Sequence, residues 1–326
     1  MNISLFQKLH ADGLIAESSL QKIKLSSGKQ LFSVYWEIKT ILYLGVLLWS
    51  GGIGILIYKN IDSIGHQVIL LFIALLSAGS FFYCFKTKLP FSLQKVASPN
   101  LFFDYILLLG CLTFISFVGY IQYQYHVFGN RFGLAMFIPM LLLFFTAYYF
   151  DQVAILSLAI TNLGAWAGIA VTPTKILLAN DFNNNTLLIM GLLLGAILIA
   201  AGVLTNNKKL KAHFEFTYTN FGLHLLFISC LAAMFQYEKW YLLWLLLLTA
   251  ISYFFYQKAI KEKSFYLLLI LSLYLYTGLS YVVIRLVFDV AKLDIGGVYL
   301  AFIYFIASAV GIILFLIKMN KKIKSV

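Results

Sequence analysis

Long runs of apolar residues, each bounded by polar or charged residues, dominate this chain. A helix needs roughly 20 mostly apolar residues to cross about 30 Å of hydrocarbon. Because lipid offers no hydrogen bonds to the backbone, runs of this length must be helical to cross it. Ten runs qualify, at about 39–58, 67–85, 101–120, 132–150, 152–172, 186–204, 216–236, 240–257, 264–285 and 295–317. The sequence therefore predicts an all-α fold, a polytopic transmembrane helical bundle of about ten spans.

The composition excludes a soluble domain. Hydrophobic residues make up 62% of the chain and charged residues only 11%, whereas a soluble domain carries about a quarter charged residues. The net charge of +12 would suggest nucleic acid only on a folded soluble domain with a basic face. We therefore expect the lipid bilayer as the surroundings of the chain and no nucleic acid as a partner.

The distribution of lysine and arginine predicts the orientation of the spans. When the ten spans alternate in direction, 18 of the 24 Lys and Arg residues fall on one side of the membrane. Cytoplasmic loops are enriched in these residues, so both termini are expected in the cytoplasm. We expect a multi-pass protein of the bacterial inner (cytoplasmic) membrane.

The residues before the first span have a different pattern. Apolar residues recur at helical spacing on both sides of the Asp12-Gly13 turn, which predicts an amphipathic helical hairpin. The expected organisation is a cytoplasmic hairpin at 1–38, a transmembrane bundle at 39–317 and a basic cytoplasmic tail at 318–326.

Three segments carry a resemblance to a known family. They read ADGLIAESSLQKI from Ala11, ILYLGVLLWSGGIGILIYKNID from Ile41 and AYYFDQVAILSLAITNLGAWAGI from Ala147. In these segments the first half of the chain resembles the bacterial predicted integral membrane proteins grouped as domain of unknown function 2157. The resemblance implies an integral membrane protein, and it implies no activity, substrate or catalytic residues.

Small and polar residues inside the spans mark a candidate transport pathway, formed by Gly51, Asn162, Gly195 and His224. Glycines let helices approach closely, and in some transporters they mark broken helices at the binding site. An amide or imidazole at membrane depth needs a partner, because lipid supplies none. Hydrogen bonding between helices and proton transfer both remain open for His224.

Charged residues near the ends of spans are the other candidates. Arg285 and Asp289 are four residues apart, so they can pair on one helix face and form a candidate gate. Asp151 separates two spans and marks a turn, with a proton relay as the sharper alternative. One lysine cluster is expected to face anionic lipid: Lys208, Lys209 and Lys211.

The sequence predicts no catalytic, cofactor or metal site. It contains no HExxH or Walker A motif, and its three cysteines lie inside apolar runs without metal-ligand spacing. We therefore expect no enzyme and no cofactor. The leading hypothesis is an integral membrane protein of unknown activity, a transporter or permease of a small solute. The alternatives are a membrane scaffold that docks a cytoplasmic protein through residues 1–38, and a transferase acting on lipid-linked substrates.

Overall fold

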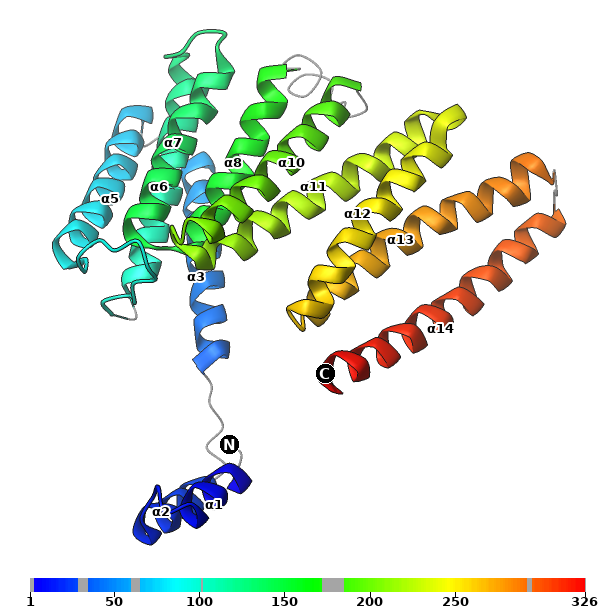
Figure 1. The fold of residues 1–326 in the computed structure, drawn as a ribbon. Helices are drawn as coiled ribbons and strands as arrows, with labels where there is room; N and C mark the ends of the chain where they lie inside the picture. The colour runs from blue at the N-terminus through cyan, green and yellow to red at the C-terminus, as the bar shows by residue number, and fades with distance from the viewer. Residues whose placement is uncertain are drawn as a thin grey trace. The chain divides into compact units, whose positions relative to one another are not determined.

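The computed structural model describes residues 3–28, 35–59, 65–100, 102–171, 185–291 and 295–325 (Figure 1). Among them, ten helices are long and apolar enough to cross a membrane. The prediction of an all-α polytopic bundle with about ten spans is confirmed, whereas the side on which the termini lie stays a prediction. The elements are α1 Ile3–Ala11, α2 Glu17–Gly28, α3 Tyr35–Lys59, α5 His66–Thr87, α6 Phe103–Tyr125, α7 Phe132–Phe150, α8 Val153–Val171, α10 Asn185–Asn207, η1 Ala212–Phe214, α11 Glu215–Gln236, η2 Glu238–Trp240, α12 Tyr241–Lys261, α13 Phe265–Arg285, the π-helical turn η3 Leu286–Val290, and α14 Ile295–Ser325.

The chain divides into two compact units, Met1–Ile69 and Leu70–Val326. In the first unit, α1 and α2 contact each other, and Leu20 of α2 is buried. Gly13, two residues after the end of α1, has a φ of +72°, a left-handed conformation that glycine adopts without steric cost. The N–H of Gly13 donates to the carbonyl of His10 at 3.0 Å. The glycine therefore closes the turn between the two helices.

In the second unit, a first core cluster joins helices α5, α6, α7, α8, α10 and α11. Leu107, Leu143 and Leu156 are fully buried in it, and so is Phe214, which immediately precedes α11. Tyr218 of α11 belongs to the same cluster, and its hydroxyl lies 3.0 Å from that of Tyr148 on α7. The cluster therefore spans residues far apart in the chain.

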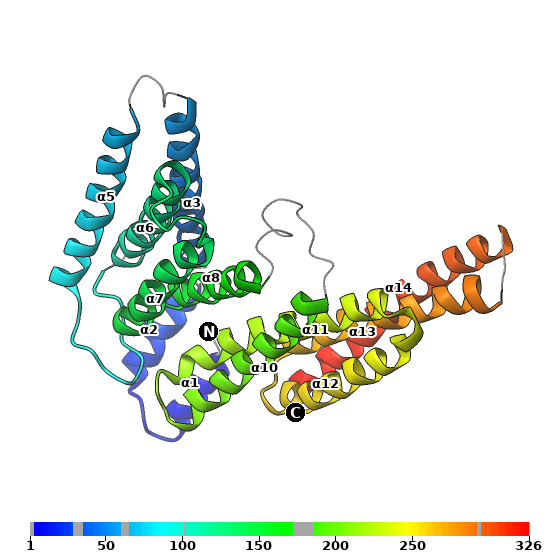
Figure 2. The same ribbon diagram turned by 90° about the horizontal axis from the view of Figure 1, so that it is seen from above.

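Helices α10 and α11 form a close antiparallel pair and lie side by side (Figures 1 and 2). A Cβ on Gly195 would lie 2.9 Å from the carbonyl oxygen of Gly222, and a Cβ on Gly222 would lie 2.8 Å from that of Gly195. Only residues without a Cβ allow two backbones to come this near. The two glycines therefore set the spacing of the pair.

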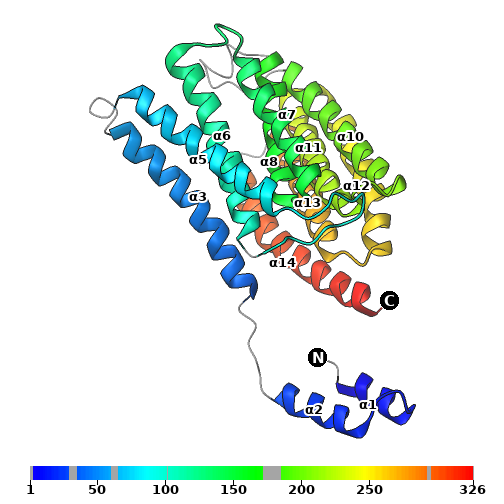
Figure 3. The same cartoon turned by 90° about the vertical axis from the view of Figure 1, so that its left-hand side faces the viewer.

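A second core cluster joins α11 to α12, α13 and the C-terminal end of α14. Phe227 of α11, Leu248 of α12 and Leu271 of α13 are buried in it. Helix α11 thus contributes to both clusters and lies among the other helices of this unit (Figure 3).

Helix α14 is the most exposed described span of this unit. It makes its main contacts with α13 and η3, and no residue of its most apolar window is buried. Its less exposed positions Tyr304, Ser308 and Ile312 recur every four residues, which is the spacing of one helix face. Met319 and Ile323 join the second core cluster. The stretch expected as a tail is helical as far as Ser325.

Candidate functional site

The four residues of the predicted pathway lie in different surroundings. Gly51 belongs to α3 in the first unit, and a Cβ there would meet nothing within 4 Å. Asn162 is half-buried on α8, and its Oδ1 has no hydrogen-bond partner among the described residues. Gly195 faces Gly222 across the α10–α11 contact. His224 is half-buried on α11, and its Nδ1 lies 2.8 Å from the Tyr274 hydroxyl of α13.

None of these four residues lines the cleft or the hollow described below. In the second unit, Gly195 and His224 take part in contacts between helices, which was one of the two alternatives for each. A neighbouring bond repeats the arrangement of His224, since the Tyr266 hydroxyl of α13 donates to Asn220 Oδ1 at 2.9 Å. The transport role of the four residues stays a prediction.

Arg285 pairs with two carboxylates, that of Asp289 four residues away and that of Glu238. Its Nε donates to Asp289 Oδ2 at 2.6 Å, and its Nη2 donates to Glu238 Oε2 at 3.0 Å. The guanidinium also lies 5.2 Å from the centre of the Tyr241 ring. Because Glu238 lies in η2, Arg285 connects the end of α13 to the segment before α12. The gate role of Arg285 and Asp289 stays a prediction, with Glu238 as a third member that the sequence did not indicate.

A buried ionic cluster connects three segments between helices. Asp151 follows α7 with a φ of 61°, which confirms that it marks the α7–α8 turn. Its Oδ2 lies 3.2 Å from Lys211 Nζ, and its Oδ1 lies 2.6 Å from His213 Nε2. Its Oδ2 also accepts the backbone N–H of Val96.

Lys211 is the most unexpected member of this cluster, because its side chain is 0% exposed. The expectation that Lys211 faces anionic lipid is therefore wrong, whereas Lys208 and Lys209 are exposed. The Lys211 ammonium also donates to the carbonyl of Gln94 at 3.2 Å. Burying an ammonium group is costly unless it is paired, and Asp151 supplies that pair. The cluster therefore holds together residues 94–96, the α7–α8 turn and the residues before α11.

A polar hollow of about 190 Å³ adjoins the cluster at His213. Lys258 of α12 lies beside it, with its ammonium 2.6 Å from Glu215 Oε1 and 3.5 Å from Glu262 Oε1. Thr219 also lines the hollow, and its buried hydroxyl has no hydrogen-bond partner among the described residues. No group of three or more His, Cys, Asp or Glu side chains in the described ranges could hold a metal ion.

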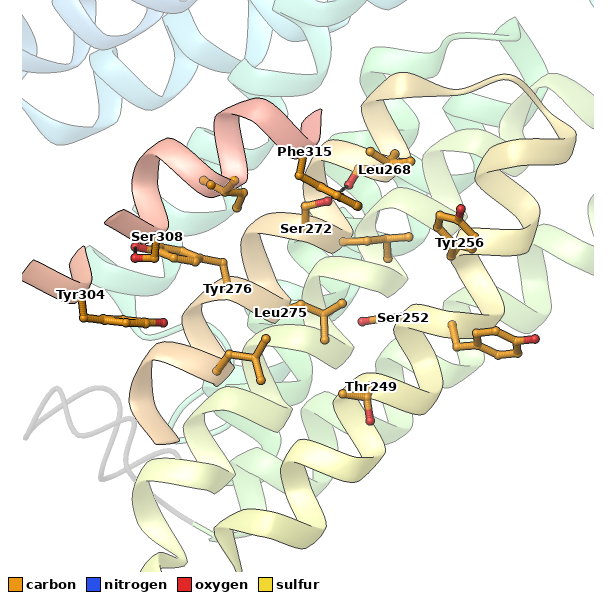
Figure 4. Close-up of a pocket in the computed structure, with 15 residues that line it drawn as sticks. Thr249, Ser252, Tyr256, Leu268, Ser272, Leu275, Tyr276, Tyr304, Ser308 and Phe315 are labelled. Atoms are coloured by element: carbon orange, nitrogen blue, oxygen red, sulfur yellow. Dashed lines mark hydrogen bonds between the residues drawn. The ribbon is translucent and has the colours of Figure 1, made fainter. Parts of the chain in front are cut away.

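The larger candidate site is a cleft of about 560 Å³ between α12, α13 and α14 (Figure 4). Helix α13 contacts both of the others, so it forms the floor and they form the walls. Thr249, Ser252 and Tyr256 come from α12. Tyr253 and Phe315 line the cleft and are also exposed, which shows that the cleft opens at the surface of the bundle.

The serine and threonine hydroxyls in the cleft bond to their own helices. Thr249, Ser252 and Ser272 donate to backbone carbonyls three or four residues earlier, at 2.7–2.8 Å. The hydroxyls of Tyr276 and Ser308 lie 3.0 Å apart and connect α13 to α14. No charged side chain is among the residues that line the cleft. The cleft therefore presents an uncharged, mainly hydrocarbon surface with a few hydroxyls.

A comparison with known families agrees with the resemblance described from the sequence. Residues 7–156 match the model of a family described as "Predicted membrane protein (DUF2157)", which confirms the resemblance found in the first half of the chain. No curated protein and no solved structure matches the chain. The chain is thus an integral, multi-pass membrane protein.

Proposed function

We propose that this protein is a membrane carrier of an amphipathic solute, with the cleft between α12, α13 and α14 as its binding site. We also propose that it works in the bacterial inner membrane. The observation that carries the proposal is the cleft itself, a hollow of about 560 Å³ within three spanning helices. Binding sites for small molecules are typically roughly 300–1,000 Å³ and mostly apolar, with a few polar groups.

The lining supports a solute with a hydrocarbon part. An ion in the cleft would have no charged partner among the lining residues, and an unpaired charge in such surroundings is strongly unfavourable. The hydroxyls of Tyr253 and Tyr256 have no side-chain hydrogen-bond partner in the described part of the chain, and they offer polar contacts at the α12 wall. A chain-bearing molecule can occupy the apolar part and bond to these hydroxyls.

The attachment of α14 supports movement of such a solute. Along the cleft, helix α14 is held to α13 by two hydroxyl contacts of 3.0 Å, Tyr304–Ser280 and Ser308–Tyr276, before Leu316 and Met319 pack with the second core cluster. A hydroxyl–hydroxyl bond contributes only about 1 kcal/mol. A wall held in this way can move at modest cost to admit a molecule from the bilayer.

The test uses a substitution that fills the cleft. Gly311 lines the cleft, and a Cβ there would meet nothing within 4 Å, so Gly311→Phe places a ring in the cleft without a backbone clash. The full chain is reconstituted in vesicles with acyl-labelled fluorescent phosphatidylcholine. Exposure of the label to dithionite then reports transfer between leaflets. We expect faster transfer with the unmodified protein and a rate near that of empty vesicles with Gly311→Phe.

The matched control is Gly296→Phe on the same helix. Gly296 is also exposed with nothing within 4 Å of its Cβ, and it lies outside the cleft. We expect this variant to transfer the probe at the unmodified rate. Equal rates for the two variants, or no acceleration by the unmodified protein, would contradict the proposal.

The scaffold hypothesis places the partner elsewhere. A cytoplasmic protein docked through residues 1–38 would contact the α1–α2 hairpin, in which Leu14 is 70% exposed. Deleting these residues separates the two hypotheses, because a carrier that uses the cleft keeps its transfer rate without them.

A further inference from the structure

We infer that the cleft holds the hydrocarbon chain of an anionic, phosphate-bearing lipid, whose head group lies among lysines at one end of α12, α13 and α14. This inference rests on the proposed function, because it names the class of molecule that the cleft binds. Two observations carry it: the depth of the cleft and the charge beyond one of its ends.

The depth of the cleft matches one leaflet. Its lining on α13 extends from Leu268 to Leu279, which corresponds to roughly 16 Å of helix at about 1.5 Å per residue. One leaflet contributes about half of the roughly 30 Å hydrocarbon thickness. The apolar wall is therefore long enough to follow a lipid chain through one leaflet.

A group of lysines lies where the hydrocarbon chain of a lipid in the cleft would reach the membrane surface. Buried Ala259, Leu267 and Ile323 join in the second core cluster, so the C-terminal ends of α12 and α14 lie with the start of α13. Exposed lysines occupy this end, and we call four of them the lysine rim: Lys261, Lys263, Lys318 and Lys321.

Lys318 continues the face of α14 that lines the cleft. It follows Phe315 by three residues, and Phe315 follows Gly311 by four, so the three positions share one side of the helix. The carboxylate at this end of α12, Glu262, lies 3.5 Å from Lys258. The positive charge of the lysine rim is thus not cancelled by that carboxylate.

Among the described residues, the opposite ends of these helices carry less unpaired positive charge, with Lys239 as the exposed lysine there. Arg285 there is paired with Asp289 and Glu238. A phosphate group is attracted to a cluster of lysines near the membrane surface, by about fivefold in affinity per lysine. The position of the charge therefore selects the lysine end for the head group.

The test measures lipid binding by native mass spectrometry of the full, delipidated chain in detergent. The probes are phosphatidylglycerol and phosphatidylcholine with identical acyl chains, which differ in net charge. We expect the unmodified protein to bind phosphatidylglycerol at least tenfold more tightly. In the double variant Lys263→Gln/Lys318→Gln, we expect this preference to fall at least fivefold, while binding of phosphatidylcholine is unchanged.

The control is Lys208→Gln/Lys209→Gln, which removes two exposed lysines outside the rim. Lys209 and Lys263 both have positive φ, of 52° and 53°, so each double variant changes one such position. We expect the control to keep the preference. Equal binding of both lipids by the unmodified protein, or an unchanged preference in Lys263→Gln/Lys318→Gln, would overturn the inference.

Two further measurements keep the outcomes distinct. Gly311→Phe should weaken both lipids equally. If it weakens neither, the cleft is not the binding site and the proposed function fails as well. If it weakens both while the lysine variants have no effect, the proposed function stands and the head-group assignment is wrong. If inorganic phosphate alone displaces phosphatidylglycerol, the lysine rim binds the free anion without a hydrocarbon chain, which also contradicts the inference.

Discussion

Replacing Lys211 with methionine tests whether the buried ion pair holds three segments of the chain together. The Lys211 and Asp151 side chains are 0% and 1% exposed, and methionine keeps most of the side-chain length without the charge. Removing one partner of a buried pair costs about 3–5 kcal/mol, because the other charge stays buried without compensation. Asp151 keeps the Val96 N–H and the His213 contact, so we expect the lower end, about 3 kcal/mol.

The measurement is thermal unfolding of the full chain in detergent. For a unit of this size, 1 kcal/mol corresponds to about 2–4 °C, so the midpoint for Lys211→Met should fall by roughly 6–12 °C. Lys209→Met is the matched control, since Lys209 is exposed and has the same φ of 52°. Exposed substitutions usually change the free energy of unfolding by less than about 0.5 kcal/mol.

A double variant separates the ion pair from side-chain packing. In Asp151→Asn/Lys211→Met neither charge remains, so we expect the midpoint to lie above that of Lys211→Met alone. Replacing both partners of a buried pair is often much less costly than removing one. If Lys211→Met unfolds within about 2 °C of Lys209→Met, the argument for the ion pair is refuted.

Three further predictions concern other contacts. Gly195→Val should lower the free energy of unfolding by about 1–3 kcal/mol, because the added side chain overpacks the α10–α11 contact; an unchanged unfolding midpoint would contradict this. His224→Phe should cost about 1–2 kcal/mol, because it leaves the half-buried Tyr274 hydroxyl unpaired, and adding Tyr274→Phe should change the midpoint little further; additive losses would argue against a direct bond. Single cysteines introduced at Lys209 and Lys239 should react with membrane-impermeant maleimide from opposite sides of the membrane, because the spanning helix α11 lies between them. The three native cysteines are buried and should not react; labelling of both positions from the same side would contradict the ten-span topology.

The spans were predictable because the signal for each lies within its own residues. The run at 132–150 corresponds to α7, Phe132–Phe150, and the run at 264–285 to α13, Phe265–Arg285. A stretch of apolar side chains is incompatible with water whatever its neighbours are. Local spacing also placed Arg285 and Asp289 on one helix face.

The partners of these residues were not predictable, because they come from distant parts of the chain. Asp151 and Lys211 are 60 residues apart, and nothing near either one indicates the other. His224 was expected to bond to a neighbouring helix or carry a proton, but the sequence did not single out Tyr274. The cleft depends on how three helices lie against one another, which hydropathy does not report. The small residues that line it, such as Ser272 and Gly311, are equally typical of tight packing.

Helix α11 contributes residues to both core clusters, and this has a consequence for synthesis at the ribosome. Phe214 and Tyr218 belong to the core of α5 to α8, so these earlier helices enter the bilayer before their own core can close. Until α11 emerges, Asp151 also lacks Lys211 and His213. The nascent protein must therefore hold several inserted but unfinished helices together, and the arrival of one later helix completes them.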